Sequence, residues 1–287
     1  MLGAIFLSAA RNPPSRPHIL GIAEVHIYSS NVPAEKDFFA KILNGSKPCD
    51  WCEKSQPEYA IVPLNKQQKI ALMNHPSADP SFLGKVSFLT DNLAAMKKFL
   101  KHNGIRFSSH PELREIMVGD PERRIIGFIQ QGPERPASPE IDSNLHLIHA
   151  GFIVHDRAAT EHFYKDILGF RPYWHGGMKD DGKDEWVSMQ VPDGTDWLEF
   201  MVNVDANADQ RLRGIMNHIA IGVTDIHEAE KRLRAAGAPV NEEPKIGRDG
   251  KWQLNLYDPD QTRVEFMEFT PVQKPCCSDF TGPHPKP

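Results

Sequence analysis

The chain has 287 residues, of which 40% are hydrophobic and 25% charged, as is ordinary for a globular protein of one or two domains. Its 33 Lys and Arg against 38 Asp and Glu give a net charge of −5, and without a basic stripe this argues against a nucleic-acid-binding protein. No apolar run approaches the roughly 18 residues of a membrane-spanning helix, so no membrane span is expected.

The chain begins with an apolar arm. Residues 1–10, MLGAIFLSAA, are similar to the apolar part of a secretory signal, although no Lys or Arg precedes them. The segment NPPSRP at 12–17 and the five prolines from Pro271 to Pro287 predict ends that are extended rather than packed. The arm leaves two locations open, export to the periplasm or medium and the cytoplasm.

Four segments share one pattern: a short apolar strand, an Asp or Asn, an amphipathic helix and a glycine. The polar residue is a typical helix N-cap, and the glycine a typical helix end. The predicted caps are Asn31, Asp91, Asp156 and Asp225, which are 60, 65 and 69 residues apart. The predicted strands are 22–28, 86–89, 150–154 and 219–223, and the helices are 34–43, 93–102, 158–168 and 226–236.

Each helix is followed by β-like runs, such as 186–190 and 197–202, so each repeat is a βαβββ module of about 60 residues. One such module cannot close a core, and we expect the modules to pair. The fold class is therefore α+β, with two tandem domains. The predicted boundaries are an arm at 1–17, a first domain at 18–132, a linker at 133–144, a second domain at 145–272 and a tail at 273–287.

The four cysteines are Cys49, Cys52, Cys276 and Cys277. A zinc site would need a second regularly spaced pair, which the adjacent residues Cys276 and Cys277 do not provide. The surroundings of the CxxC motif also lack a thioredoxin-like pattern. Loop disulfides are the favoured interpretation and free thiols the second, with the pairing left open.

Two histidines and two glutamates occupy corresponding places in the third and fourth modules. His149 and His218 each begin a first strand, and Glu199 and Glu265 follow 50 and 47 residues later. Because side chains alternate across a strand, the large apolar neighbours should pack under the helices. The His faces carry small neighbours such as Gly151 and should line a cavity, where the four polar groups converge.

Four ionisable groups in one cavity need a reason, since buried and unpaired carboxylates are costly. One divalent cation supplies it, and imidazole with carboxylate suits Zn, Ni, Co, Mn or Fe. We predict His149, Glu199, His218 and Glu265 as metal ligands and Glu265 and Glu199 as catalytic candidates. Open positions on the ion would accept two oxygens of a small-molecule substrate.

The first domain serves as an internal control. Aligning its strands with those of the second places Glu24 at the position of His149, Lys85 at that of His218, and Gly127 at that of Glu265. Ala71 falls near the position of Glu199. We therefore expect no catalytic metal in the first domain, which would instead brace, cover or dimerise.

The chain resembles the vicinal oxygen chelate superfamily over residues 18–272. The segments that carry the resemblance are HAGFIVHD at 149–156, FYKDILGF at 163–170, NHIAIGVTD at 217–225 and YDPD at 257–260 followed by Glu265. The superfamily includes glyoxalase I, extradiol dioxygenases and antibiotic resistance proteins. The resemblance implies curved mixed sheets and a divalent metal in the second domain.

The ligand set is similar to that of glyoxalase I. This implies a lyase or isomerase in which a glutamate, Glu265 or Glu199, moves a proton between adjacent carbons next to the metal. The architecture departs from that family, because typical glyoxalase I chains are shorter and often dimerise to build their sites. A homodimer of this chain stays open as an expectation.

Two alternatives stay open. In an extradiol dioxygenase His149, His218 and Glu265 would hold ferrous iron, but the family's Tyr is replaced by Asn255 and no His occurs in 241–256. In a binding or sequestering protein the cavity would hold a ligand without turnover. Relatives of that kind without a metal carry neutral residues at these positions, which favours an enzyme.

Overall fold

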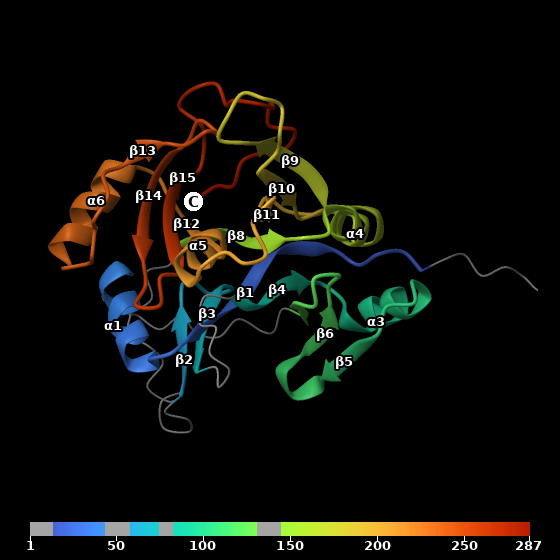
Figure 1. The fold of residues 1–287 in the computed structure, drawn as a ribbon. Helices are drawn as coiled ribbons and strands as arrows, with labels where there is room; N and C mark the ends of the chain where they lie inside the picture. Colours follow the sequence, from blue (N-terminus) through green and yellow to red (C-terminus); the bar gives the residue numbers. More distant parts are fainter. Residues whose placement is uncertain (1–13, 44–57, 75–82, 131–144) are drawn as a thin grey trace, which may run out of the picture.

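The computed structural model describes residues 14–43, 58–74, 83–130 and 145–287, whose strands form two mixed sheets (Figure 1). The α+β class and the repeated modules are thereby confirmed. The predictions for most of the N-terminal arm, for Cys49 and Cys52 and for the linker lie outside the described residues. None of the helices in the described ranges is long and apolar enough to cross a bilayer.

The first sheet has seven strands in the order β2-β3-β1-β4-β7-β6-β5. Its strands are β1 (Ile19–Ser29), β2 (Tyr59–Pro63), β3 (Lys69–Asn74), β4 (Leu83–Thr90), β5 (Phe107–His110), β6 (Glu115–Gly119) and β7 (Ile125–Gln130). Its helices are α1 (Val32–Ile42), α3 (Leu93–His102) and the 3₁₀ helix η1 (Pro111–Leu113). The central strands β1 and β4 are antiparallel, and each has a parallel neighbour on its other side.

The second sheet has eight strands in the order β13-β14-β15-β12-β8-β11-β10-β9. Its strands are β8 (His146–Val154), β9 (Arg171–Gly176), β10 (Trp186–Gln190), β11 (Trp197–Val202), β12 (His218–Val223), β13 (Lys245–Ile246), β14 (Trp252–Tyr257) and β15 (Arg263–Glu268). Its helices are α4 (Arg157–Glu161), the π-helix η2 (His162–Ile167), α5 (Gln210–Met216) and α6 (Ile226–Ala235). Apart from β9 the connectivity repeats that of the first sheet, with β8 and β12 in the places of β1 and β4.

Three of the four predicted helix caps are confirmed, and the second is wrong. Asn31, Asp156 and Asp225 each accept a backbone N–H from the first turn of the helix that follows. In the second module Asn92 takes this role, with Oδ1 2.9 Å from Ala95 N. Asp91 instead accepts the backbone N–H of His18, which joins the helix start to the beginning of the chain.

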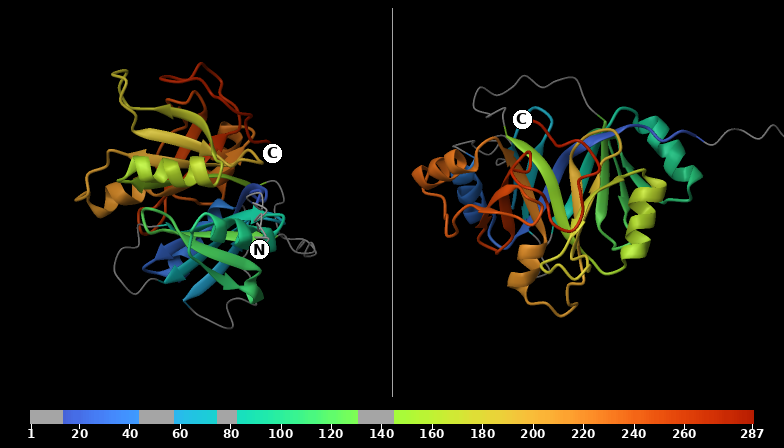
Figure 2. Two further views of the ribbon diagram at one scale, coloured as in Figure 1. Left: turned by 90° about the vertical axis from the view of Figure 1, so that its right-hand side faces the viewer. Right: turned by 90° about the horizontal axis from the view of Figure 1, so that it is seen from above.

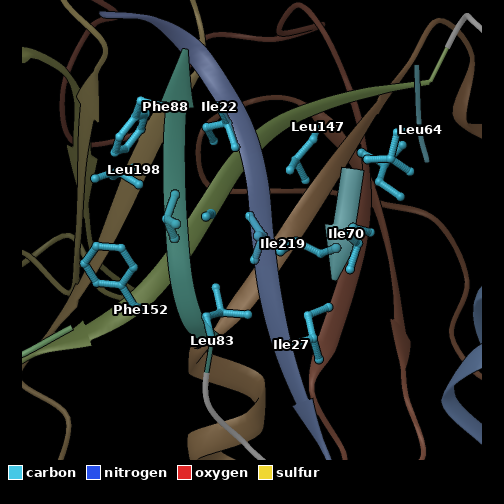
Figure 3. Close-up of a cluster of buried hydrophobic side chains, with 14 of the residues drawn as sticks. Ile22, Ile27, Leu64, Ile70, Leu83, Phe88, Leu147, Phe152, Leu198 and Ile219 are labelled. Carbon is cyan, nitrogen blue, oxygen red and sulfur yellow. The ribbon is translucent and has the colours of Figure 1, made fainter. Parts of the chain in front are cut away.

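The apolar faces of the two sheets pack against each other in one continuous core (Figure 3). Side chains of β1 such as Ile22 lie opposite side chains of the second sheet such as Ile219. Phe88 of β4 also contacts Phe170, with ring centroids 5.3 Å apart. The expectation that these faces pack under helices is therefore correct only in part, because each sheet also covers the other.

Polar side chains fasten the two sheets together at the ends of this core. The amide of Gln68 donates to the carbonyls of Ile22 and Leu147, at 3.0 and 2.9 Å, and its oxygen accepts the Leu147 N–H at 2.8 Å. Ser30 N donates to Asp260 at 2.7 Å. The first half of the chain thus braces the sheet that carries the predicted metal ligands.

The C-terminal tail is packed, which corrects the expectation of an extended end. Thr281 N donates to the Tyr173 carbonyl at 3.0 Å, and Gln190 Nε2 donates to the Pro283 carbonyl at 2.8 Å. Strand β9 is an edge strand, and its free backbone groups provide the partners that a proline-rich segment lacks within itself. Figure 2 shows the tail, in red, crossing above the second sheet. Within the tail Cys276 and Cys277 form a disulfide with each other.

Candidate metal centre

The four predicted ligands come from four neighbouring strands of the second sheet. One row across these strands contains Glu265 on β15, Ala220 on β12 and His149 on β8. The adjacent row contains His218 on β12, Gly151 on β8 and Glu199 on β11. Each row therefore has two ionisable side chains separated by one small residue, and all four side chains lie on the same face.

The small residues allow the four side chains to converge. His149 Nε2 lies 3.6 Å from Glu265 Oε2 across Ala220, and His218 Nε2 lies 3.2 Å from Glu199 Oε2 across Gly151. The two rows meet where the Nε2 atoms of the imidazoles approach to 3.0 Å. Glu265 Oε2 is also 3.9 Å from His218 Nε2. The structure thus brings together every residue of the predicted site.

The arrangement requires a glycine at position 151, because the His218 ring lies where a side chain at this position would be. From the sequence, only the small size of Gly151 was apparent. A Cβ atom at this position would lie 2.0 Å from Cε1 of the His218 ring, far inside van der Waals contact. The absence of a side chain lets the imidazole lie across β8. The orientation of His218 therefore depends on a glycine in the neighbouring strand.

Both imidazoles are fully buried, which determines their charge. Burial lowers the pKa of His149 and of His218 well below the ordinary value, so both rings are neutral near pH 7. His218 Nδ1 lies 3.1 Å from the Met216 carbonyl, which can only accept a hydrogen bond, so Nδ1 carries the proton. The lone pair of His218 Nε2 then faces the other ligands, as metal binding requires.

The two carboxyl groups differ in their exposure. Glu265 is only 2% exposed, and burial raises its pKa to about 7. The side chain of Glu199 is 14% exposed and lies at the other end of the cluster. Across the described ranges, neither carboxylate forms an ion pair with a Lys or Arg side chain. Arg263 lowers the pKa of Glu265, and Lys251 acts on both acids electrostatically, but no described cation pairs directly with either carboxylate.

The geometry of the cluster fits a metal ion. Ligand atoms about 2.1 Å from a common ion, at angles of about 90–110°, lie about 3.0–3.4 Å from one another. The shortest separations, 3.0 Å between the imidazoles and 3.2 Å from His218 to Glu199, fall in this range. Imidazole and carboxylate ligands suit zinc, iron, nickel, cobalt or manganese. His149, Glu199 and His218, with Glu265 beside them, could therefore hold one such ion.

Three further residues border the site, and the sequence analysis did not select them for it. The Trp197 ring packs on His149, with centroids 4.7 Å apart. Asn255 lies directly opposite Glu265 on β14, and its buried Oδ1 has no hydrogen-bond partner among the described residues. Lys251, just before β14, is fully buried. No sequence signal marks Lys251, because a lysine in a loop between Gly and Trp is normally exposed.

Comparison with known proteins identifies the class to which this fold and site belong. Residues 146–266 match the family model of the Glyoxalase/Bleomycin resistance protein/Dioxygenase superfamily. The second half of the chain is therefore a member of this superfamily, which is the vicinal oxygen chelate superfamily indicated by the motifs.

Individual relatives show two kinds of similarity. The chain is 28% identical over 126 residues to lactoylglutathione lyase of Haemophilus influenzae, covering 43% of this chain and 93% of that protein. A catechol 2,3-dioxygenase structure is similar over 90% of this chain and 92% of its own, with a TM-score of 0.63 and 17% identity. A variant of homoprotocatechuate 2,3-dioxygenase from Brevibacterium fuscum is similar over 95% and 75%, with a TM-score of 0.67 and 17% identity. At this identity the two structures establish the shared fold of two sheets in one chain.

Proposed function

We propose that the protein is a metal-dependent lyase or isomerase of the glyoxalase type, acting on a small molecule with two adjacent oxygens. One observation carries the proposal: two neutral imidazoles and two carboxylates converge on one face of a sheet without a Lys or Arg ion-pair partner among the described residues. His149, Glu199, His218 and Glu265 would hold the ion. The similarity to lactoylglutathione lyase covers nearly all of that protein and supports the same reading.

The reaction would be a proton transfer between two adjacent carbons. When bound, the metal ion polarises a substrate oxygen and makes the neighbouring C–H bond more acidic. A carboxylate of the site, Glu199 or Glu265, takes the proton from one carbon and returns it to the next. One proton is removed and one is added, so the reaction needs no oxidant or reductant, and the carboxyl group can exchange its proton with solvent between the two steps.

The positions of the two carboxylates suit different roles, one in holding the ion and one in transferring the proton. Glu265 lies 3.6 and 3.9 Å from the two imidazoles and is almost fully buried, so it can add to the ligand set from the closed side of the cluster. Glu199 lies 3.2 Å from His218 and within 4.8 Å of a ligand nitrogen of His149, and it is the more exposed of the two, which places it nearer to an incoming substrate. We assign Glu265 mainly to holding the ion and Glu199 to carrying the proton.

A second candidate is an iron-dependent dioxygenase. It is favoured by one observation, the combination of His149, His218 and Glu265, since two histidines and one carboxylate with open positions suit ferrous iron. Against it, Asn255 stands where the ring-cleaving relatives carry a Tyr. The nearby Tyr257 hydroxyl donates to Glu242 at 2.8 Å and is not available at the site.

Elemental analysis of the full chain, purified without a metal-affinity tag, tests the proposal. We expect about one transition-metal ion per chain in the parent and in the control His162→Ala, whose side chain is 66% exposed, and none in His218→Ala. Loss of the ion from both variants, or no ion in the parent after refilling with zinc, nickel and iron, would contradict the metal site.

The reaction is then tested with the metal-loaded protein in deuterated water. Proton transfer predicts deuterium incorporation at the carbon beside the oxygens of a hemithioacetal formed from methylglyoxal and a thiol, followed by nuclear magnetic resonance. Oxygen consumption with a catechol, in the absence of exchange, would instead establish the dioxygenase.

A further inference from the structure

A lysine is buried beside the metal centre without a polar partner. Lys251 is 0% exposed, and no donor or acceptor in the described parts of the chain lies within hydrogen-bonding distance of its Nζ. An ammonium group that is removed from water without a partner costs several kcal/mol. Such a group is expected only where something compensates its charge.

Three aromatic rings surround this ammonium group. Nζ lies 4.6 Å from the centroid of the Trp197 ring, 5.2 Å from that of Phe280 and 5.6 Å from that of Tyr173. Cation–π attraction stabilises a charge weakly and provides none of the three hydrogen bonds that an ammonium group can donate. The rings therefore hold the charge in place without satisfying it.

The acidic groups nearby do not satisfy it either. Asp249 is the acid next to it in its own loop, and its Oδ1 accepts the backbone N–H of Lys251 at 3.2 Å. Glu199 and Glu265 are close enough to influence the lysine electrostatically, but neither forms an ion pair with it among the described residues. Burial lowers the pKa of Lys251 to about 8, so the group is still mostly protonated at pH 7.

The position of the lysine points to the substrate. The Trp197 ring contacts both the Lys251 ammonium group and the His149 imidazole, so the charge lies one ring away from the ligands. The charges of a divalent ion and of the two carboxylates in the cluster cancel. Asp249 offsets one of the two positive charges of Lys251 and Arg263, so one positive charge remains beside the site. A ligand with a negative charge would balance it.

We propose that Lys251 is a specificity-determining residue that binds a carboxylate group of the substrate. The substrate class is then a small organic anion in which a carboxylate is next to an oxygen-bearing carbon, such as a 2-oxo or 2-hydroxy acid. This inference rests on the function proposed above, because the metal would bind the adjacent oxygens of the same molecule.

The C-terminal tail completes the binding site for this carboxylate. Phe280 packs on Tyr173, with ring centroids 4.8 Å apart, and forms one side of the aromatic box. Two contacts with Tyr173 fix the tail there. The Tyr173 hydroxyl lies 2.6 Å from His284 Nδ1, and the Tyr173 carbonyl accepts the Thr281 N–H at 3.0 Å. By excluding water the tail strengthens the attraction between the ammonium group and a carboxylate.

The test compares two ligands of similar shape and different charge, oxamate and oxamide. Both have two adjacent oxygens, but only oxamate carries a negative charge. Each is titrated by calorimetry into the cobalt(II)-loaded full chain, and the ratio of their affinities is measured. The chains are the parent, Lys251→Met, Lys251→Arg and the control Lys245→Met, whose lysine is 56% exposed and pairs with Glu242.

We expect the preference for oxamate to fall at least about tenfold in Lys251→Met, because a hydrogen bond to a charged group contributes about 1.5–3 kcal/mol. Lys251→Arg should retain much of the preference, and Lys245→Met should equal the parent. An unchanged ratio in Lys251→Met, or an equal fall in Lys245→Met, would overturn the proposal.

Cobalt content, measured after dialysis, separates this proposal from the one on which it rests. If Lys251→Met binds cobalt like the parent but keeps the full preference for oxamate, the substrate class is wrong and the metal site stands. If the parent binds no cobalt, the proposed function fails and this inference fails with it. Should Lys251→Met not fold, Lys251→Gln removes the charge while keeping a polar head and serves for the same comparison.

Discussion

The concave faces of the two sheets have the same geometry and neutralise buried acids in different ways. In the first sheet, strand register places Glu24 where the second has His149, and Lys85 where it has His218. Lys85 Nζ lies 3.0 Å from Glu24 Oε1 and 2.9 Å from Glu115 Oε1, so one ammonium group bridges two carboxylates. The second sheet has two carboxylates with which no Lys or Arg of the described residues forms an ion pair, and the proposed metal ion would take that role.

The matching rows continue across the outer strands. Gly127 occupies the place of Glu265, and Ala71 occupies that of Glu199. A Cβ atom on Gly127 would lie 2.2 Å from Glu115 Oε1, so this glycine makes room for an acid that arrives from β6. The comparison teaches that the scaffold fixes where charges meet, and the residues in two rows decide whether a lysine or, as proposed for the second sheet, a metal ion joins them.

The largest expected effect comes from removing one acid from the second sheet. Glu265→Gln should lose the metal ion and at least about 100-fold in turnover, because a carboxylate ligand becomes a neutral amide. The matched change in the first sheet, Glu115→Gln, should leave both unchanged. Metal content and turnover are measured in parallel, and parent-like values of both in Glu265→Gln would refute the site.

Removing the cation of the first sheet should act on stability and leave the metal unaffected. Burial alone would raise the pKa of Glu24, but His26, Lys69 and Lys85 outweigh it and hold that pKa well below its usual range. Lys85→Met removes the cation that pairs with the buried Glu115 and one of the three partners of Glu24, so we expect the free energy of unfolding to fall by about 3–5 kcal/mol.

Urea denaturation measures this loss, with Lys69→Met as its control. Lys69 also pairs with Glu24, but its side chain is 42% exposed, so its removal should cost no more than about 1 kcal/mol. Equal losses in the two variants would mean that Lys85 has no special role. A loss of metal from Lys85→Met would mean that the two concave faces are coupled.

The convergence of the four predicted ligands was predictable from the sequence because its evidence is local and repeated. His149 and His218 lie on corresponding strands of two similar modules, and the alternation of side chains along a strand assigns each of them to a face. The role of Glu115 was not predictable, because it lies on β6, and in the sheet β7 separates this strand from β4, which carries Lys85. The cap at Asn92 was mistaken for Asp91 because adjacent Asp and Asn residues have nearly equal capping preferences.

The contacts of the tail and of Lys251 were also beyond sequence reasoning. A proline-rich segment indicates an extended backbone, but an extended backbone can lie along an edge strand as well as in water. The burial of Lys251 depends on Phe280 from that tail and on Trp197 from a distant strand. These contacts join segments that are far apart in the sequence, and no sequence motif links them.

A smaller effect is expected from the glycine under the His218 ring. Gly151→Ala places a methyl group where the imidazole lies, so the ring must move and metal affinity should fall about 10–100-fold. Gly119→Ala is the matched control, since a Cβ there meets nothing within 4 Å. Competition with a chromogenic chelator measures both. An unchanged affinity in Gly151→Ala would show that the ring position does not limit binding.

The smallest effect concerns the contact between the sheets, where Glu35 of α1 meets Asp258 in the turn before β15. Burial raises the pKa of Glu35 well above its ordinary value and that of Asp258 to about 7. Asp258 raises the pKa of Glu35 further, whereas the hydrogen bond from Glu35 lowers that of Asp258. Folding therefore takes up protons at these groups. Their contribution is fully favourable below about pH 4, where both groups are protonated even in the unfolded chain, and it is lost as the pH rises through about 7.

Glu35→Gln removes one of the two acids without changing the size of the side chain. At pH 8 the variant should be more stable than the parent by about 1–3 kcal/mol. The parent must either bury a second negative charge beside Asp258 or take up a proton at Glu35, and the neutral amide of the variant avoids both costs. At pH 4 the two proteins should differ little, since the parent pair is already protonated. Urea denaturation at both pH values measures the difference. A gain of equal size at pH 4 and pH 8 would mean that packing, and not the proton shared by the two acids, governs this contact between the sheets.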